Sequence, residues 1–502
     1  MTGPVPRLAC LGPPRLLAGL DEVGWLDRVT HLTVHGALPE QRSGELLELA
    51  DNIDLRGRGG AGFPFARKLR AVAAAARRAD GRTAVVVNGS EGEPSCLKDT
   101  ALLLHTPHLV LDGAQLAAEA LGAEDIAVGV TRPDVARSVS DAVAQRAPGG
   151  CRIRVTQLPE RFVTGEGTAL TSGLNSGIAL PSGRRVRTSD SGLGGLPTLL
   201  SNTETYAQLA VAARLGALPF RATGLPTEPG TVLLTVAGAQ VVEVPTGVPL
   251  PFVLDLCGTD PGQGVLVGGY HGRWLGPGAA RAATVSRDAL AAQGAALGAG
   301  AVLPLPEDTC PAGETLRVAR WMAAESAGQC GPCVLGLPSL ADALADLVHG
   351  GGRTAFEAVH TRVRAVRGRG ACSHPDGTSH FVASALAAFP DDFEQHAFGG
   401  GCGRSVRGIL PLPAEDPAGT VPYGPPSAEP PTGTSAEADE RLVVDWTLCQ
   451  GHGLCADIVP GVIRLGSDGY PAQASMPLPR RQRPRALRAI RRCPALALRI
   501  QT

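Results

Sequence analysis

Hydrophobic and polar positions between residues 46 and 130 fall into segments of two kinds. Residues 84–88 and 126–130 are short apolar runs that end in polar residues, so we expect two buried strands there. In residues 107–122 apolar side chains recur at helical spacing, and residues 65–78 form a second expected helix. Strands that alternate with helices predict a mostly parallel sheet with both faces covered.

The pattern changes after residue 230. Residues 231–250 and 264–275 are short β-type runs punctuated by Gly and Pro, which predicts a small β-rich unit to about residue 300. Helical patterns dominate from about 310 to 397. Residues 411–440 are rich in Pro, Ser, Thr and acidic side chains and contain few large apolar ones, so we expect an extended tether. A last unit of about 60 residues follows it.

Composition narrows the functional class. With 502 residues the chain is too long for one core, and 46 basic against 47 acidic residues give no general nucleic-acid signal. The first twenty residues lack a secretory signal and no apolar run reaches membrane-spanning length, so we expect a cytoplasmic protein. Twelve cysteines in such a chain indicate metal or redox chemistry rather than disulfides.

A glycine-rich loop, RGRGGAGFP, occupies residues 56–64 and precedes the helix over 65–78. Glycines allow close approach of the backbone to a ligand, and consecutive N–H groups ahead of a helix can cradle an anion. Lys68, one turn into that helix, would add a positive charge to a phosphate. Only two lysines occur in the chain, Lys68 and Lys98. An ordinary turn is the alternative interpretation.

A second polar block, NGSEGEP, spans residues 88–94 and directly follows an expected strand. The carboxyl ends of strands in open α/β sheets are where such folds bind ligands. The alternative is a surface loop, in which the nearby Lys98 and Asp99 form only an exposed ion pair.

Two further blocks follow in order: GEGTAL at residues 165–170, and LPT with NTET between 196 and 205. Together the four blocks resemble the flavin subunit of complex I and related subunits of NAD-reducing hydrogenases and formate dehydrogenases. The resemblance covers roughly residues 40–400. It implies hydride transfer from NADH to FMN and exit of single electrons through iron–sulfur centres. Hydride transfer depends on ring-to-ring positioning, so we expect no catalytic acid–base pair.

The resemblance also implies a set of residues around FMN and the nicotinamide dinucleotide. Phe63, Lys68 and Glu93 would face the nicotinamide nucleotide. The whole set of candidate cofactor-binding residues is Gly57, Arg58, Gly59, Gly60, Ala61, Gly62, Phe63, Lys68, Asn88, Ser90, Glu91, Glu93, Gly165, Glu166, Gly167, Ser201, Asn202 and Thr205.

The nucleotide site departs from the family pattern at several positions. Where the family has a second carboxylate near the adenosine ribose, this chain has Gly167; that carboxylate would disfavour a 2′-phosphate. Arg70 and Arg187 replace the aromatic residues that sandwich the adenine, and arginine can also pair with a phosphate. Both NADH and NADPH therefore remain open.

The helical segment contains three cysteines at family positions, Cys330, Cys333 and Cys372. Thiolates are what an iron–sulfur cluster requires, and the family implies [4Fe–4S]. The family's first cysteine is replaced by Ala327, so a [3Fe–4S] cluster and a [4Fe–4S] cluster with a different fourth ligand are both open. A lost cluster, or zinc held by these cysteines with His374, are the alternatives. Candidates for a fourth ligand are solvent, Ser326, Cys310, Cys402 and His374.

Beyond the tether, Cys449 and Cys455 with a remote Cys493-Pro resemble the ligand pattern of actinobacterial single-cluster ferredoxins. The middle position of the usual three-cysteine run is His452. The resemblance implies a small α+β unit with a [3Fe–4S] or unusually ligated [4Fe–4S] cluster. His452 is either its fourth ligand or a solvated side chain.

The last unit also carries a dense group of arginines. On a helix they would form a basic face, and we hypothesise that it docks an acidic electron acceptor. A merely solvated face is the alternative. The seven arginines are Arg480, Arg481, Arg483, Arg485, Arg488, Arg491 and Arg492.

These observations combine into an α/β protein of four domains and a linker. We expect a Rossmann-like FMN/NAD(P)H-binding domain (1–228), a β-grasp domain (229–303), a helical iron–sulfur domain (304–405), a flexible Pro-rich linker (406–440) and a ferredoxin-like domain (441–502). The expected function is NAD(P)H oxidation with delivery of electrons to a redox partner protein, for which a membrane-bound acceptor is one candidate, from the cytoplasm or the periphery of a membrane complex. Two alternatives stay open: a non-catalytic electron-wiring or scaffold subunit with a degenerate nucleotide site, and a zinc-stabilised binding protein.

Overall fold

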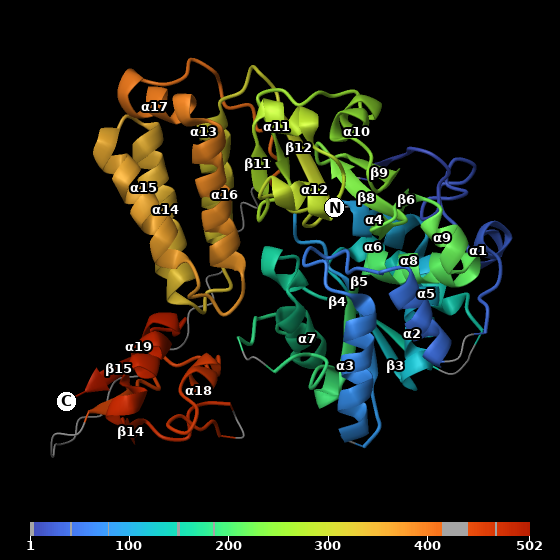
Figure 1. Cartoon of the computed structure of the whole chain (residues 1–502), viewed down its shortest axis with the longest axis horizontal. Coiled ribbons are helices and arrows are strands. Elements are labelled where there is room, and N and C mark those ends of the chain that lie inside the picture. Colours follow the sequence, from blue (N-terminus) through green and yellow to red (C-terminus); the bar gives the residue numbers. More distant parts are fainter. Residues whose placement is uncertain are drawn as a thin grey trace.

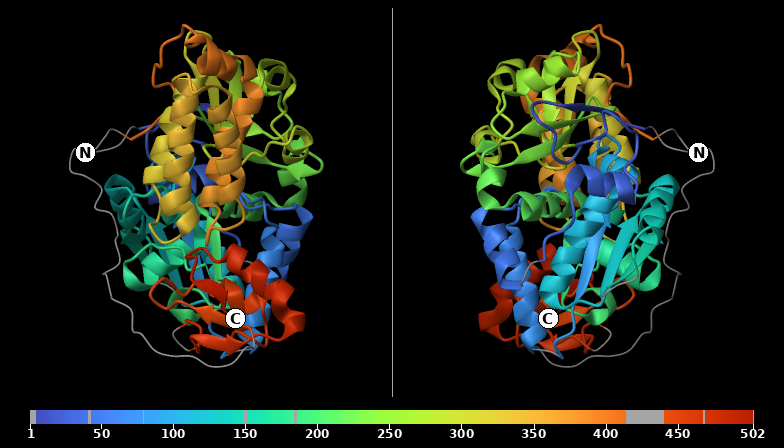
Figure 2. Two further views of the ribbon diagram at one scale, coloured as in Figure 1. Left: turned by 90° about the vertical axis from the view of Figure 1, so that its left-hand side faces the viewer. Right: turned by 90° about the vertical axis from the view of Figure 1, so that its right-hand side faces the viewer.

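The structure is a computed structural model that describes residues 5–40, 43–78, 80–147, 151–183, 186–413, 440–466 and 469–501. Four units are visible in Figure 1: a parallel sheet with its helices, a β-rich unit, a helical bundle and a small C-terminal unit. The side views in Figure 2 show the C-terminal unit below the helical bundle and next to the first unit.

The first unit is built on a four-stranded parallel sheet of order β4-β3-β2-β5. Its strands are β2 (Ala84–Gly89), β3 (Asp125–Val130), β4 (Arg152–Gln157) and β5 (Thr198–Asn202). The apolar residues 84–87 of β2 are fully buried, which confirms the prediction of a covered parallel sheet in an α/β fold. The chain runs from β2 to β3 and β4 on one side and then returns to β5 on the other. The strand order therefore reverses between β2 and β5, at their carboxyl ends.

Helices cover this sheet, and two of them pack unusually closely. A Cβ atom added at Gly113 of α5 would lie 1.9 Å from the carbonyl oxygen of Tyr206 in α8, so only glycine permits this approach of two backbones. The helices of the unit are α1 (Arg28–His35), α2 (Ser43–Asn52), α3 (Phe65–Arg78), α4 (Lys98–His105), α5 (Pro107–Leu121), α6 (Pro133–Ala144), α7 (Gly167–Ser176), α8 (Thr203–Leu215) and α9 (Ala217–Arg221).

The β-rich unit is a six-stranded mixed sheet of order β1-β9-β8-β12-β10-β11. Its edge strand β1 (Arg7–Cys10) comes from the N-terminal part of the chain, which we grouped with residues 1–228, and it pairs in parallel with β9. The other strands are β8 (Thr231–Val236), β9 (Gln240–Pro245), β10 (Gly264–Val267), β11 (Arg273–Leu275) and β12 (Ala301–Leu305), accompanied by α10 (Leu250–Leu256), α11 (Pro277–Ala282) and α12 (Arg287–Ala292). A short separate pair joins β6 (Gly224–Leu225) to β7 (Glu228–Pro229).

The helical bundle shares a hydrophobic core with the β-rich unit. Leu266 and Trp274 of the sheet belong to one buried cluster with Phe381 and Phe393 of the bundle, and such a continuous core fixes the two units relative to each other. The bundle contains α13 (Pro311–Ala324), α14 (Leu337–Val348), α15 (Gly352–Val366), α16 (His374–Ala388) and α17 (Pro390–Gly399).

The start of the expected linker is packed rather than free. Backbone N–H groups of residues 407–410 donate to the buried carboxylate of Glu314, and Leu410 is fully buried. Residues 414–439 of the expected linker lie outside the described residues.

The C-terminal unit has its own core and an antiparallel sheet of order β14-β13-β15. Its elements are β13 (Arg441–Val444), α18 (Leu454–Ile458), β14 (Ser475–Pro477), α19 (Arg483–Arg492) and β15 (Leu498–Gln501). Among the helices that the structure describes, none has the length and apolarity to cross a membrane.

Candidate cofactor-binding sites

A cavity of about 360 Å³ lies at the carboxyl ends of β2 and β5. Loops 58–60 and 88–99 form one wall, and loops 268–272 and 296–299 of the β-rich unit form the opposite one. Its volume falls in the range of small-molecule sites, and it sits where the strand order reverses, the position at which open α/β sheets bind nucleotides. This cavity is therefore the place to test whether a flavin nucleotide fits.

Half of the predicted cofactor-binding residues line this cavity. The lining residues from that set are Arg58, Gly59, Gly60, Asn88, Ser90, Glu91, Glu93, Gly165 and Asn202. The predicted residues that are not in its lining are Gly57, Ala61, Gly62, Phe63, Lys68, Glu166, Gly167, Ser201 and Thr205.

Several predicted residues that do not line the cavity form hydrogen bonds to the segments around it. The Thr205 hydroxyl accepts the Arg58 backbone N–H at 2.9 Å, and the Lys68 ammonium donates to the Leu200 carbonyl at 2.7 Å. The Glu166 carboxylate caps the first turn of α7 rather than reaching into the cavity. These side chains position the loops that form the wall.

Glycines let these loops come close to each other. A Cβ atom at Gly59 would lie 3.2 Å from the Asn202 Cβ, and one at Gly92 would lie 2.4 Å from the Arg161 carbonyl oxygen. Gly60 has a φ of 111°, in the region that favours glycine. Larger residues at these positions would push the walls apart.

Two buried side chains in the cavity wall have polar atoms without a hydrogen-bond partner among the described residues. One of them, Arg58, forms a long ion pair, with its Nε atom 3.8 Å from an oxygen of Glu204. Arg58 donates through Nη2 to the Thr231 carbonyl at 3.2 Å, but its Nε and Nη1 atoms and the Ser90 Oγ have no hydrogen-bond partner among the described residues. Burial lowers the pKa of Arg58. Unpaired buried donors are costly unless a ligand satisfies them, and guanidinium groups pair well with phosphate. This cradle therefore fits a phosphate-bearing flavin such as FMN.

Lys98 is the centre of a buried polar network. Its ammonium lies 2.8 Å from an oxygen of Asp99, 3.1 Å from Glu204 and 3.3 Å from the amide oxygen of Asn202. Burial alone would lower the pKa of Lys98, but Asp99 and Glu204 outweigh it and the net pKa is raised. Lys98 and Asp99 are thus not an exposed pair, and both line the cavity. The rarity of lysine in the chain was the only sequence signal for this.

Two carboxyl groups of the second polar block have different environments. Glu91 accepts the backbone N–H groups of Asp99 and Thr100 at the start of α4, and burial together with the charge of Asp99 raises its pKa. Glu93 accepts the Ser95 hydroxyl at 2.6 Å and the Tyr270 N–H at 2.8 Å, and burial raises its pKa to about 7. Glu93 can therefore hold or release a proton near neutral pH at the cavity wall.

Three aromatic rings lie between this cavity and the cysteines of the bundle. The Phe162 ring centroid is 4.8 Å from that of His271 and 5.3 Å from that of His374. Phe162 and His271 line the large cavity, whereas His374 lines the cysteine site. Burial lowers the pKa of His271 to about 3, so this ring is neutral. No motif in the sequence pointed to His271, because its partners are distant along the chain.

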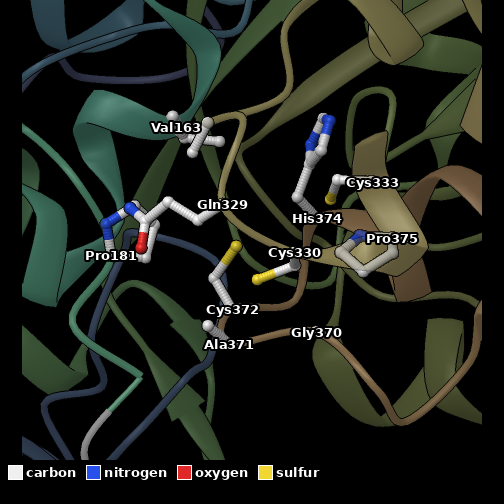
Figure 3. A pocket seen from close by; sticks show the side chains of 11 residues that line it. Val163, Pro181, Gln329, Cys330, Cys333, Gly370, Ala371, Cys372, His374 and Pro375 are labelled. Carbon is white, nitrogen blue, oxygen red and sulfur yellow. The ribbon is translucent and has the colours of Figure 1, made fainter. Parts of the chain in front are cut away.

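Cys330, Cys333 and Cys372 line one small cavity together with Ala327 and His374. Figure 3 shows the sulfur atoms of Cys330 and Cys372 directed toward each other. Burial raises the pKa of Cys330 to about 12 and that of Cys372 to about 11. Three convergent sulfur donors fit an iron–sulfur cluster, whose positive charge stabilises the thiolate form.

Ala327 has no side-chain atom that can bind iron, so a fourth ligand would have to come from another group. Burial raises the pKa of Cys333, and a hydrogen bond with Ser326 partly opposes this, so Ser326 lies next to the site. His374 has its Nε2 atom 2.8 Å from the Met322 carbonyl, and its buried Nδ1 has no partner among the described residues. His374 therefore lines the site and Ser326 lies next to it, so both stay candidates for the fourth ligand.

Cys310 and Cys402, the other candidates, do not lie at this site. They flank His396, with sulfur to Nε2 distances of 3.1 and 3.3 Å. Cys310 precedes α13 and Cys330 follows it, and a helix of 14 residues is about 20 Å long. Cys310 and Cys402 are therefore excluded as ligands of the Cys330 site.

The cysteines of the C-terminal unit, Cys449, Cys455 and Cys493, are partly exposed and close enough to affect one another. Burial, followed by the proximity of Cys493 and Cys449, raises the pKa of Cys455 to about 11. The set offers three thiolates around one site, as a small cluster requires.

His452 is buried rather than solvated, and it faces another unit. Its Nε2 atom lies 3.6 Å from the sulfur of Cys330, and burial lowers its pKa to about 4. Nearby, the Gly331 N–H donates to the Pro494 carbonyl at 2.6 Å. The two cysteine sites therefore meet across the interface between the bundle and the C-terminal unit.

Comparisons with known proteins match the regions of the chain that contain these sites. Residues 50–211 match the Nuo51 FMN-binding domain, residues 314–396 the iron–sulfur binding region of NADH-ubiquinone oxidoreductase F, and residues 442–500 a 4Fe–4S single cluster domain. These matches confirm the resemblance found in the sequence, because regions similar to an FMN-binding domain, an iron–sulfur binding region and a single-cluster domain follow one another along the chain in the expected order.

Individual relatives extend over most of the chain. The NADH-quinone oxidoreductase F subunit 2 of Rhizobium meliloti is 28% identical over 384 residues, which cover 72% of this chain and 90% of the relative. The corresponding F subunit of Streptomyces coelicolor is 28% identical over 388 residues, covering 71% and 84%. The crystal structure of an NAD+-reducing [NiFe]-hydrogenase in the H2-reduced state superimposes with a TM-score of 0.68 at 26% identity, over 78% of this chain and 68% of that one.

Proposed function

We propose that this protein oxidises NAD(P)H and passes single electrons to a redox partner protein. The observation that carries the proposal is the cavity at the β2–β5 reversal, which is lined by Arg58 and Ser90, two buried side chains with polar atoms that have no hydrogen-bond partner among the described residues. The match of residues 50–211 to an FMN-binding domain and the name of the NADH-quinone oxidoreductase relatives support it.

The bound groups supply the redox chemistry, FMN accepting a hydride and iron–sulfur clusters carrying electrons one at a time. The chain's own residues bind and orient these groups. Arg58 and the loop N–H groups would hold the phosphate, and the Lys98 network would fix the loops around it. Glu93 would meet the nicotinamide and hold a proton near neutral pH.

Cysteines would hold the two clusters, Cys330, Cys333 and Cys372 in the bundle and Cys449, Cys455 and Cys493 in the C-terminal unit. The interface that brings His452 within 3.6 Å of Cys330 supports direct electron exchange between these sites. The units would then be a Rossmann-like FMN domain, a β-grasp domain, a helical iron–sulfur domain and a ferredoxin domain.

The partner would be an acidic electron carrier, met by the arginines of the C-terminal unit. We propose that this protein works at the cytoplasmic side, either free or at the periphery of a membrane complex. The relatives' names as subunits support this proposal.

A visible spectrum of anaerobically prepared full chain tests the function. We expect released FMN, iron and sulfide, and a flavin band that bleaches on addition of NADH or NADPH. Separate titrations with the two nucleotides decide between them, because Gly167 and Arg70 leave both open. Iron absorbance without bleaching by either nucleotide would support the electron-wiring alternative instead, and a colourless protein would contradict both.

A further inference from the structure

Three side chains that can bind a metal lie close together on the helical bundle. They are separate from the cavity at the carboxyl ends of β2 and β5, here called the flavin cavity, and from the cysteine sites at Cys330 and Cys455. Cys310 precedes α13, His396 lies near the end of α17 and Cys402 follows shortly after it. The His396 Nε2 atom is 3.1 Å from the Cys310 sulfur and 3.3 Å from the Cys402 sulfur. All three ligand atoms lie within 4.8 Å of one another.

The ring of His396 is oriented by its other nitrogen. The Nδ1 atom lies 2.9 Å from the Val348 carbonyl oxygen at the end of α14. A carbonyl only accepts hydrogen bonds, so Nδ1 carries the proton and the lone pair of Nε2 is directed at the two sulfur atoms. This backbone contact is the usual outer partner of a metal-binding histidine.

Cys310 is placed to act as a thiolate. Its sulfur accepts the Gly313 N–H at 3.2 Å in the first turn of α13, and the side chain is buried. Burial raises the pKa of this thiol to about 11, whereas the N-terminal end of the helix favours negative charge, so a bound metal ion would complete the change to the thiolate.

Cys402 reaches the same point through a glycine loop. Gly400, Gly401 and Gly403 have φ values of 84°, 116° and 72°, which side chains rarely adopt. The loop reverses the chain after α17 and brings Cys402 back to His396.

We propose that Cys310, His396 and Cys402 bind one zinc ion, with a water molecule as the fourth ligand. Two sulfur atoms and one imidazole nitrogen are a ligand set that zinc prefers, in tetrahedral geometry. Two thiolates balance the charge of Zn²⁺, so the metal leaves no unpaired buried charge.

The zinc ion would tie the start of α13 to the end of α17. Just beyond Cys402, Ser405 pairs with Thr309 and the N–H groups of residues 407–410 bind Glu314. The metal would therefore fix the point from which the chain leaves the bundle toward the C-terminal unit.

The test uses the full chain, purified anaerobically without a chelating tag. We expect elemental analysis to find about one zinc ion per chain. In Cys310→Ser and Cys402→Ser the zinc content should fall below about 0.2 per chain, because removal of one of three protein ligands removes most of the affinity for the metal. Zinc-edge X-ray absorption should show two sulfur neighbours at about 2.3 Å and lighter neighbours at about 2.0–2.1 Å. Flavin content should not change, since the site is separate from the flavin cavity.

Controls of the same residue types are Cys151→Ser, a half-buried cysteine, and His360→Gln, an exposed histidine. Both should keep the zinc. A wild-type chain without zinc, a zinc ion with a different neighbour set, or a disulfide between Cys310 and Cys402 in the same preparation would each overturn the proposal. The zinc-edge X-ray absorption spectrum of the wild-type chain tests the proposed ligand set even if a cysteine variant fails to fold.

Discussion

Glu93 is a carboxyl group whose surroundings bring its pKa close to neutral pH. Burial raises its pKa to about 7, against an ordinary value of 4.5, although hydrogen bonds from Ser95 and from the Tyr270 N–H oppose the shift. When a nicotinamide loses hydride its ring gains positive charge, which an ionised Glu93 stabilises. We therefore expect the rate of flavin reduction by NAD(P)H to rise from pH 6 to pH 8, with a midpoint near 7, in stopped-flow measurements.

The variant Glu93→Gln should remove this rise and leave a flat profile over the same range, because an amide does not ionise. Glu357→Gln, an exposed carboxyl group on α15, serves as the control and should keep the wild-type profile. An unchanged pH dependence in Glu93→Gln would assign the ionisation to another group.

Gly92 shows how one missing side chain shapes the flavin cavity. A Cβ atom there would lie 2.4 Å from the Arg161 carbonyl oxygen and 2.8 Å from the Phe162 Cα, and backbone atoms cannot rotate away. We expect Gly92→Ala to weaken FMN binding at least tenfold, or about 1.4 kcal/mol, as measured by flavin fluorescence during titration of the flavin-free chain.

A matched glycine provides the control for that variant. Gly44 of α2 has no atom within 4 Å of an added Cβ, so Gly44→Ala should leave FMN binding unchanged and stabilise the chain by about 0.5–1 kcal/mol. Equal FMN affinity in both variants would show that loop 161–162 does not shape the site.

Single residues also mark the limit of what the sequence could predict. The glycine and polar loops were predicted because their residue types and their order along the chain are specific. The buried role of Lys98 was not, because its partner Glu204 is 106 positions away and only the fold brings them to 3.1 Å. The same holds for His271 and for the grouping of Cys310 with Cys402.

At the scale of elements, regular patterns predicted regular structure well. The helix expected over 65–78 is α3, and the strands expected at 84–88 and 126–130 are β2 and β3, each within one residue. Strand β1 was missed because four residues carry too little periodicity, and its partner β9 lies more than 200 residues later. Long-range pairing of this kind depends on tertiary structure, not on local preference.

The segment after α17 is held to the bundle by one carboxylate. Glu314, fully buried, accepts the N–H groups of residues 407–410 and pairs with Arg317 at 2.7 Å. Glu314→Gln replaces one acceptor oxygen by a donor that faces these N–H groups. We expect it to lower the free energy of unfolding by about 2–4 kcal/mol, measured by denaturant titration.

The control is Glu357→Gln, an exposed member of an i,i+4 pair on the same bundle, which should change stability by less than about 0.5 kcal/mol. Equal stability of the two variants would show that the segment 407–410 contributes nothing to the fold.

In the whole molecule, the candidate sites form one series that leads from the first unit through the helical bundle to the C-terminal unit, which also lies next to the first unit (Figure 2). The flavin cavity, the aromatic rings of Phe162 and His374, the Cys330 site and His452 follow one another from the first unit to the last. The sequence predicted a separate C-terminal unit, but not that this unit rests directly against Cys330. A tether alone would have left that unit's position open.

The outer face of the C-terminal unit tests how electrons leave the molecule. Of the seven arginines between residues 480 and 492, Arg483 pairs with Glu440 and Arg492 donates to the Gly368 carbonyl. Arg481, Arg485 and Arg488 are exposed and can attract an acidic protein. Replacing these three by Gln should slow reduction of an acidic haem protein such as cytochrome b5 at low salt by about tenfold or more. Raising the ionic strength should slow the wild-type chain in the same way, since the screening length falls to about 3 Å at 1 M.

Two comparisons separate this docking from a general loss of activity. Reduction of the bound flavin by NAD(P)H in a single turnover should be unchanged, because these arginines lie on the C-terminal unit and not at the flavin cavity. Replacement of Arg362 and Arg364, two exposed arginines of α15, by Gln should leave the rate with cytochrome b5 as it was. The basic haem protein cytochrome c should respond in the opposite direction, reacting faster with the triple variant than with the wild type, because the repulsion between like charges is removed. Rates that ignore both the substitutions and the salt would mean that electrons leave through another face.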